Sequence, residues 1–151
     1  MGQRMAAARF VIAALKLGAA AIDEQGREGQ ILDHLEAGHL ADREADEAVR
    51  FIRENRARPF FLNLWHHAVH PPLEGRADLV AKYAHLRKRP AAYAAMVEGV
   101  DESVGALLQV LDELGLAETT LLIFTSDNGG AGYIGLPDVN KPFRGWKITF
   151  F

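Results

Sequence analysis

Two short segments of the sequence carry polar side chains that could support chemistry. Residues 126–130 read Ser-Asp-Asn-Gly-Gly after an apolar run, and residues 66–70 read His-His-Ala-Val-His before two prolines. Asp127 and Asn128 offer a carboxylate and an amide oxygen, the kinds of ligand that Ca²⁺ and Mg²⁺ prefer. Asp-Asn-Gly-Gly is also ordinary turn chemistry, so the tetrapeptide by itself leaves both a turn and a metal site open.

The histidines of residues 66–70 raise the question of a zinc site, because imidazole is a frequent zinc ligand. The His-Glu-x-x-His zinc spacing depends on a helix and a glutamate, whereas these histidines follow a predicted strand and precede Pro71 and Pro72. The sequence therefore argues against zinc at this position.

A third polar segment lies near the C-terminal end, where Arg144 and Lys147 flank Gly145 and Trp146. Two cations at this spacing could bind an oxyanion such as sulfate or phosphate. A charged surface loop is the alternative, and the spacing alone does not separate the two.

Two helices are predicted to support these segments. Apolar residues at steps of three and four predict a helix in residues 40–55, with Asp42 as its N-cap. The same periodicity predicts a longer helix from Pro90 to a C-cap at Gly115. Between the two helices, residues 71–89 are expected to be irregular after the double proline.

Two strands are predicted to deliver the polar segments to one place. Residues 60–65 read as a mostly buried strand, and residues 119–127 read as a central strand covered on both faces. A strand, a crossover helix and a second strand in one sheet are almost always parallel. We therefore expect the two strands to run side by side and to end at the same edge, where open α/β sheets bind ligands.

Residues 1–38 are expected to form an N-terminal amphipathic and linker segment, separate from a domain at residues 39–151. Lys16 interrupts the apolar, alanine-rich stretch near the N-terminus, and its uninterrupted core FVIAAL is shorter than a usual signal-peptide core. It is also far below the roughly 20 residues that span a bilayer. This favours an ordinary amphipathic helix followed by a polar linker at residues 23–30, and it leaves the localisation open.

The composition is that of a globular domain. The chain has 151 residues, of which 49% are hydrophobic and 25% charged, which is enough to bury a core. A net charge of −3 and scattered basic residues argue against nucleic acid as a partner. The absence of cysteine excludes disulfides, thiolate zinc sites and thiol nucleophiles within this sequence.

Taken together, the segments resemble a known family. PFFLNLWHHAVHPPL, YAAMVEGVDESVGALLQVLDELGLAETTLLIFTSDNGG and NKPFRGWK occur in the order and at about the spacing seen in sulfatases of the arylsulfatase type. The resemblance covers residues 39–151, and Ser-Asp-Asn-Gly-Gly is its most specific part. It implies the alkaline-phosphatase-like α/β sandwich, of which this chain would form a part, with a mostly parallel sheet and flanking helices.

The resemblance also implies roles for particular residues. It assigns Asp127 and Asn128 to an active-site Ca²⁺, which favours the metal reading of this pair over the turn. It assigns His70 to contact with the sulfate ester, helping the leaving group depart. It assigns Lys147 to binding of the sulfate group, as a cation that offsets charge developing in the transition state. Arg144 would have a structural task, and His66 and His67 receive no role.

The sequence departs from the family pattern in its nucleophile. Sulfatases use a formylglycine made from the Cys or Ser of a C/S-x-P/A-x-R motif, and neither Ser103 nor Ser126 lies in such a motif. The opening strand with paired aspartates and the later Glu-Gly-Gly are also not found. We therefore expect an internal segment of a sulfatase catalytic domain, with an incomplete calcium site and no turnover on its own.

The parent enzyme is expected to act on a sulfate ester, either a small molecule or a sulfated glycan. A complementing sulfatase segment is a further candidate partner, and no membrane span is expected. Two alternatives stay open at this point. One is a phosphoesterase of the same superfamily, and the other is a non-catalytic remnant that retains the scaffold for a protein interaction and exposes sheet edges.

Overall fold

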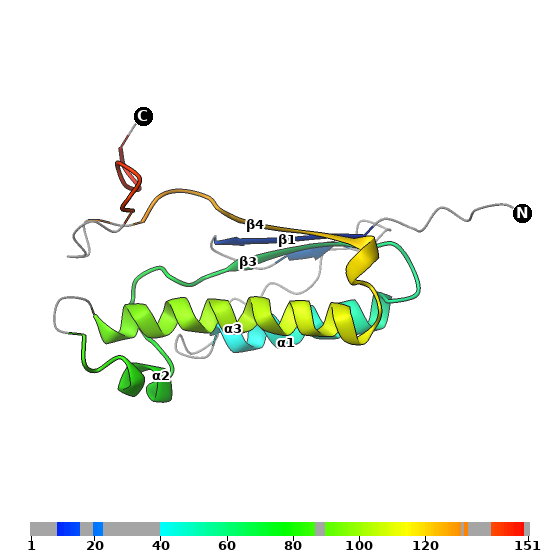
Figure 1. Ribbon diagram of the computed structural model, residues 1–151, viewed down its shortest axis with the longest axis horizontal. Coiled ribbons are helices and arrows are strands. Elements are labelled where there is room, and N and C mark those ends of the chain that lie inside the picture. Colours follow the sequence, from blue (N-terminus) through cyan, green and yellow to red (C-terminus); the bar gives the residue numbers. More distant parts are fainter. Residues whose placement is uncertain are drawn as a thin grey trace, which may run out of the picture.

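The computed structural model of this chain describes residues 9–15, 20–22, 40–86, 90–130, 132 and 140–149, with the first two ranges described by their backbone. Figure 1 shows a sheet with α1 and α3 lying against one of its faces. The elements in chain order are β1 (Arg9–Leu15), β2 (Ala20–Ile22), α1 (Leu40–Asn55), β3 (Phe61–His66), α2 (Ala77–Lys82), α3 (Ala91–Glu113), the 3-10 turn η2 (Ala117–Thr119) and β4 (Thr120–Ser126).

The sheet has the strand order β2-β3-β1-β4. β1 runs parallel to both β3 and β4, and β2 pairs antiparallel with β3. Leu15 pairs with His66 on one side and with Ser126 on the other, so β3 and β4 end level at the same edge. The shared edge was predicted from the sequence. The prediction that the two strands are neighbours was wrong, because β1 lies between them.

The N-terminal segment corrects a second expectation. Residues 9–15, expected in an amphipathic helix, form β1, and residues 20–22 form β2. As a strand between two parallel neighbours, β1 can satisfy its backbone N–H and C=O groups on both sides. A short apolar run suits such a position as well as it suits a helix. The polar linker expected at residues 23–30 lies outside the described residues.

The first helix forms where the periodicity predicted it. α1 buries Ala45, Ala48 and Ile52 against the rest of the molecule. The helix begins at Leu40, so Asp42 lies within its first turn and is not the N-cap that the sequence suggested. A carboxylate in the first turn still faces the positive end of the helix dipole.

The long helix α3 ends as the sequence predicted. Gly115 adopts a positive φ of 65°, a conformation that glycine tolerates without a steric cost. Its N–H bonds to the carbonyl of Asp112, and the N–H of Leu116 bonds to that of Leu111. This pair of bonds is the Schellman arrangement, which satisfies the last carbonyls of the helix. None of the helices that the structure describes combines the length and the apolar character that crossing a bilayer requires.

The segment between β3 and α3 is more regular than expected, because residues 77–82 form the short helix α2. Its Leu79 is buried. Gly75, just before α2, allows the chain to approach α3 closely, since a Cβ at this position would lie 2.6 Å from Cβ of Ala95. α2 therefore packs on α3 directly after the loop that leaves β3.

The main hydrophobic core lies between the sheet and the two long helices. α1 and α3 both face β3, whose alternating inward side chains Leu62 and Leu64 are almost completely buried. Burial of each large apolar side chain contributes about 1.5–3 kcal/mol. The buried cluster consists of Ala48, Ile52, Phe60, Leu62, Leu64, Leu107, Val110, Leu111 and Leu116.

The opposite face of the sheet differs from the prediction for the last strand. β4 was expected to be covered on both faces, but Leu121 and Ile123 are 53% and 41% exposed. Phe61 of β3 lies on the same face, because Phe10 pairs with both Phe61 and Leu121. The physical reason is that the long helices both pack on one side of the sheet. Among the described elements, no helix covers the other side (Figure 1).

Candidate functional site

The loop of residues 67–75 leaves the carboxyl end of β3 and carries His70; we call it the His70 loop. The His70 ring places Nδ1 2.8 Å from the carbonyl oxygen of Pro71. A carbonyl can only accept, so Nδ1 carries a proton and donates it. The other ring nitrogen, Nε2, is thereby left as the atom that can exchange a proton with a ligand. The backbone N–H of His70 bonds to the carbonyl of His67, which closes a turn in the loop.

His66, to which the sequence assigned no role, is completely buried at the end of β3. Its Nδ1 lies 2.8 Å from Oε2 of Glu44 on α1, and its Nε2 lies 3.3 Å from Oγ of Ser103 on α3. The other oxygen of Glu44 accepts the backbone N–H of His67 at 3.3 Å. One buried carboxylate therefore binds two consecutive residues where the strand passes into the His70 loop.

Glu44, His66 and Ser103 have the order of groups found in serine hydrolases, in which a carboxylate orients a histidine beside a hydroxyl. Their exposed fractions are 3%, 0% and 2%, so no substrate can reach the hydroxyl. The trio is a buried polar contact between α1, β3 and α3. The sequence held a signal for it, because Glu44 and Ser103 occupy positions on the apolar faces of their helices.

Asp127 and Asn128 follow β4 directly and are exposed. The hydroxyl of Ser126 donates to the carbonyl of Asn128 at 2.6 Å, which closes a local turn. This contact engages Ser126 in the backbone of the turn. The turn leaves the carboxylate of Asp127 and the amide of Asn128 at the surface of the sheet edge.

Two glycines after this turn bring Lys147 beside it. The N–H of Gly130 donates to Oδ1 of Asn140 at 2.9 Å, and the N–H of Lys147 donates to the carbonyl of Gly130 at 3.0 Å. A Cβ at Gly129 would lie 2.6 Å from Nδ2 of Asn140, so this close approach requires glycine. Asn140 also donates to the carbonyl of Gly145 at 2.9 Å. Sequence reasoning missed Asn140, since a single asparagine in a turn carries no distinguishing signal.

The four residues that the resemblance singled out therefore lie at one edge of the sheet. Hydrogen bonds join Lys147 to the turn of Asp127 and Asn128. His66 and Ser126 pair with the same residue of β1, so the two strand ends are two interstrand spacings apart, roughly 10 Å. His70 follows one of these ends, and within the described residues no hydrogen bond joins it to the turn after the other.

The oxygen ligands at this edge do not by themselves complete a calcium site. Ca²⁺ takes six to eight oxygens. Within the described ranges no group of three or more His, Asp or Glu side chains is placed to hold one ion. Asp127 and Asn128 offer two side-chain oxygens at neighbouring positions. Their chemistry is compatible with part of a calcium site, and the described residues do not supply a complete one.

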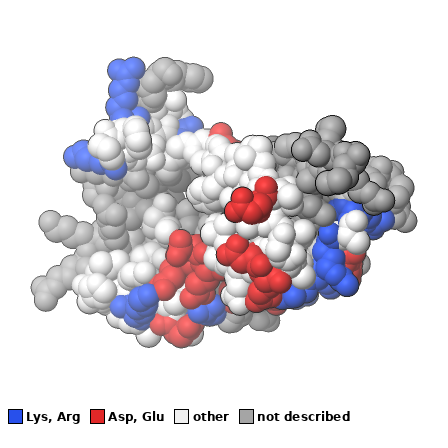
Figure 2. Space-filling model, turned by 45° about the vertical axis from the view of Figure 1, so that its right-hand side comes forward, with Lys and Arg blue, Asp and Glu red and all other residues white. Residues whose placement is uncertain are grey.

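The charged surface shows no single dominant patch on the face that Figure 2 presents. Asp and Glu side chains group in its lower middle, and Lys and Arg side chains lie in separate groups around them. On this face, the described Lys and Arg side chains do not form the continuous basic stripe that is typical of nucleic-acid binding.

A sequence model of the sulfatase family matches residues 12–148 of this chain. The chain belongs to the sulfatase family. A sulfatase from Formosa agariphila is 38% identical over 128 residues, covering 75% of this chain and 23% of the relative. Steryl-sulfatase from Mus musculus is 46% identical over 92 residues, covering 61% and 14%. The solved structure of PsFucS1 sulfatase from Pseudoalteromonas sp. has a TM-score of 0.60 and 27% identity, covering 82% and 25%.

The comparisons place this sulfatase chain within the alkaline-phosphatase-like fold. The family match begins at residue 12, inside β1, whereas the sequence placed the start of the domain at residue 39. The chain spans 23% and 14% of the length of the two curated relatives. It therefore corresponds to part of a sulfatase domain, in which the two strand ends and the loops after them are represented.

Proposed function

We propose that this chain is part of a catalytic domain that hydrolyses sulfate esters, on a small molecule or on a sulfated glycan. The observation that carries the proposal is that β3 and β4 end at the same edge of the sheet, so that the His70 loop and the Asp127 turn both begin there, in a chain of the sulfatase family. Ligands of open α/β sheets bind at the carboxyl ends of the strands.

His70 is the proposed acid for the leaving group. Its Nδ1–H is engaged by the carbonyl of Pro71, so a proton destined for the leaving alcohol would be carried on Nε2. A positioned histidine that transfers a proton in this way accelerates a reaction by about 10²–10⁴-fold. The hydrogen bond to Pro71 also fixes the orientation of the ring.

Lys147 is the proposed sulfate ligand. Its backbone N–H bonds to the carbonyl of Gly130, which holds the residue beside the Asp127 turn. A fixed cation at this position would attract the sulfate group and offset charge that develops as the ester bond breaks.

Asp127 and Asn128 are the proposed contribution of this chain to a calcium site. A bound Ca²⁺ would polarise a sulfate oxygen. Calcium added to the purified chain should raise the melting temperature, because a ligand that binds only the folded state stabilises it. Asp127→Ala should abolish that rise, while Asp112→Ala, which removes an exposed carboxylate at the far end of α3, should preserve it. An equal rise in both variants would contradict the assignment.

The chain has no cysteine and no serine in a formylglycine motif, so we propose that it does not turn over a sulfate ester unaided. The test is incubation of the purified chain with 4-nitrophenyl sulfate, with nitrophenol release followed by absorbance. Release at the rate of the buffer blank is expected. Hydrolysis that His70→Ala abolishes would overturn the proposal of inactivity.

Sulfate binding can be tested without turnover. Inorganic sulfate should shift the ring signals of His70 in a nuclear magnetic resonance titration, and Lys147→Ala should weaken that response. His85 is a matched control, because it is exposed and its Nδ1 also contacts a backbone carbonyl, that of Lys82, at 3.1 Å. An equal response at His70 and His85 would indicate that sulfate has no specific site here.

A docking role is a second candidate, favoured by the exposed apolar residues of β4. A sheet face with Leu121 and Ile123 half exposed is suited to a complementing sulfatase segment. In the absence of that segment, the uncovered face should make the purified chain self-associate. Ile123→Lys should then reduce self-association in sedimentation experiments, while Leu108→Lys on the outer side of α3 should have no comparable effect. Equal sedimentation of wild type and Ile123→Lys would contradict this role.

A further inference from the structure

The His70 loop is attached to the fold at two stems, and both stems end in polar contacts. The first stem is the end of β3, at His66 and His67. The second stem is Arg76, the residue that directly precedes α2. The side chains that bind each stem show which elements fix the position of the loop.

The first stem is held by α1 and α3 together. Glu44 of α1 accepts the ring N–H of His66 and the backbone N–H of His67, at 2.8 and 3.3 Å. Ser103 of α3 contacts the other ring nitrogen of His66. Because Glu44, His66 and Ser103 are all buried, the hydrogen bonds of the His66 ring are shielded from water, while that of the His67 N–H is partly buried.

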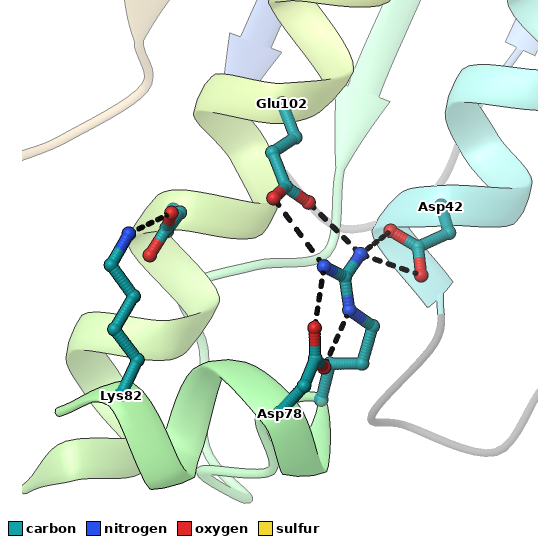
Figure 3. A network of polar contacts seen from close by, with 6 residues as sticks. Asp42, Asp78, Lys82 and Glu102 are labelled. Atoms are coloured by element: carbon teal, nitrogen blue, oxygen red, sulfur yellow. Dashed lines mark hydrogen bonds and ion pairs between the residues drawn. The ribbon is translucent and has the colours of Figure 1, made fainter. Parts of the chain in front are cut away.

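The second stem is held by the same two helices. The guanidinium of Arg76 contacts Asp42 of α1, Glu102 of α3 and Asp78 of α2, and Figure 3 shows these three carboxylates converging on one point. The distances are 3.3 Å to Asp42, 2.9 Å to Glu102 and 2.8 Å to Asp78. The hydrogen bond from Arg76 lowers the pKa of the Asp78 carboxyl. The planar fork of arginine suits such a junction, because it offers donors in several directions at once.

The four groups from the long helices are close neighbours in sequence. Asp42 and Glu44 lie two positions apart on α1, and Glu102 and Ser103 are consecutive on α3. One member of each pair holds the first stem, and the other holds the second. We call Asp42, Glu44, Glu102 and Ser103 the clamp.

Between its stems, the loop also packs against α3. Ala68 is buried in a small apolar cluster with Met96 and Val100, and Val69 and Leu73 pack against this cluster. The loop is therefore fixed at both ends by polar groups and along its inner side by apolar ones.

We propose that the clamp sets the position of His70, so that Glu44 and Arg76 are positioning residues for the ring. Only the role of the His70 ring as an acid rests on the proposed function; its positioning by the clamp does not. The ring of His67, which follows the first stem, lies edge-on to the ring of His70 with 6.1 Å between their centroids. A displacement of the first stem is therefore transmitted to His70 through both the backbone turn and this ring contact.

The test compares ring nitrogen signals of His70 in the ¹⁵N-labelled chain, without any ligand. The wild type should show one set of signals with the proton on Nδ1. Glu44→Ala and Arg76→Ala should each lose this preference and give averaged or multiple signals. Glu44→Gln should restore the wild-type pattern at His70, because its amide oxygen can still accept the N–H of His67.

Glu113→Ala is the matched control. Glu113 of α3 bonds to Arg53 of α1 at 2.6 Å, so it joins the same two helices away from the His70 loop. Its removal should leave the His70 signals unchanged. If Glu44→Ala and Arg76→Ala lower the melting temperature while the His70 signals stay as in the control, the clamp stabilises the fold and does not position the ring, and the inference is overturned.

Failure of the proposed function and failure of the positioning inference give different results. Should Glu44→Ala fail to fold, Arg76→Ala carries the test, because Arg76 is partly exposed and its loss leaves no buried orphan of this kind. A wild-type His70 that ignores inorganic sulfate would contradict the proposed function, while the effect of the two variants on the ring would still decide the inference about the clamp.

Discussion

The buried carboxylate Glu44 allows a quantitative prediction about stability. In Glu44→Ala, the ring N–H of His66 and the backbone N–H of His67 both lose their acceptor. Each buried donor left without a partner costs about 1–3 kcal/mol. The His66 donor is fully buried and the His67 donor partly buried, and together they give a predicted loss of about 2–6 kcal/mol.

Glu44→Gln should cost much less, for a reason that can be observed directly. The amide oxygen can accept the N–H of His67, which turns the NH₂ group toward Nδ1 of His66. Nδ1 must then accept, so the proton moves to Nε2, where it donates to Ser103. Glutamine thus satisfies every group that glutamate satisfies, provided that His66 changes its tautomer.

The assay is urea unfolding followed by circular dichroism, combined with ring ¹⁵N shifts of His66. Glu113→Ala, which removes an exposed carboxylate between the same helices, should change the unfolding free energy little. The reasoning is refuted if Glu44→Gln costs as much as Glu44→Ala, or if His66 keeps its proton on Nδ1 in the glutamine variant.

Three further predictions concern the core, the site and the pH dependence. Leu107→Ala should lower the unfolding free energy by about 2–5 kcal/mol, because the side chain is fully buried, while its half-exposed neighbour Leu108→Ala should change it little in the same urea titration. Gly129→Ala should drive its Cβ into Asn140 and speed hydrogen exchange in residues 140–147, and unchanged protection there would show that the contact is dispensable. Glu113 has a folded pKa below its ordinary 4.5, chiefly through the hydrogen bond from its arginine partner on α1. Its contribution is therefore present above about pH 4.5 and is lost as the pH falls through the lower folded pKa, so Glu113→Gln should flatten the acid limb of melting temperature against pH.

The elements that support the site could be predicted because their patterns are long and unambiguous. The apolar stripe of residues 91–113 and the glycine after it define α3 and its end, and no other structure fits both signals. The apolar runs of β3 and β4 are separated by this helix, which makes them parallel and aligns their ends. From these facts alone, His70 and Asp127 are expected at one edge of the sheet.

The first strand could not be predicted in the same way. The run of residues 9–15 is apolar from Phe10 to Leu15 without alternation, and such a short run reads equally well as part of a helix. The exposure of the β4 side chains could not be predicted from the sequence either, because the pattern of a strand does not show whether helices cover one face of the sheet or both. Both errors concern the environment of a segment, which is set by the rest of the fold.

The roles of His66 and Glu44 were missed because each residue is ambiguous when taken alone. A glutamate at a core position of a helix and a histidine at the end of a strand become interpretable only when the two are placed together. Replacing every partner of a buried polar trio by apolar groups of the same shape can be nearly neutral for stability. The trio instead fixes the relative orientation of the elements that it joins, because each hydrogen bond has a preferred geometry. Here the elements are α1, β3 and α3, and the segment whose direction they determine is the loop that carries His70.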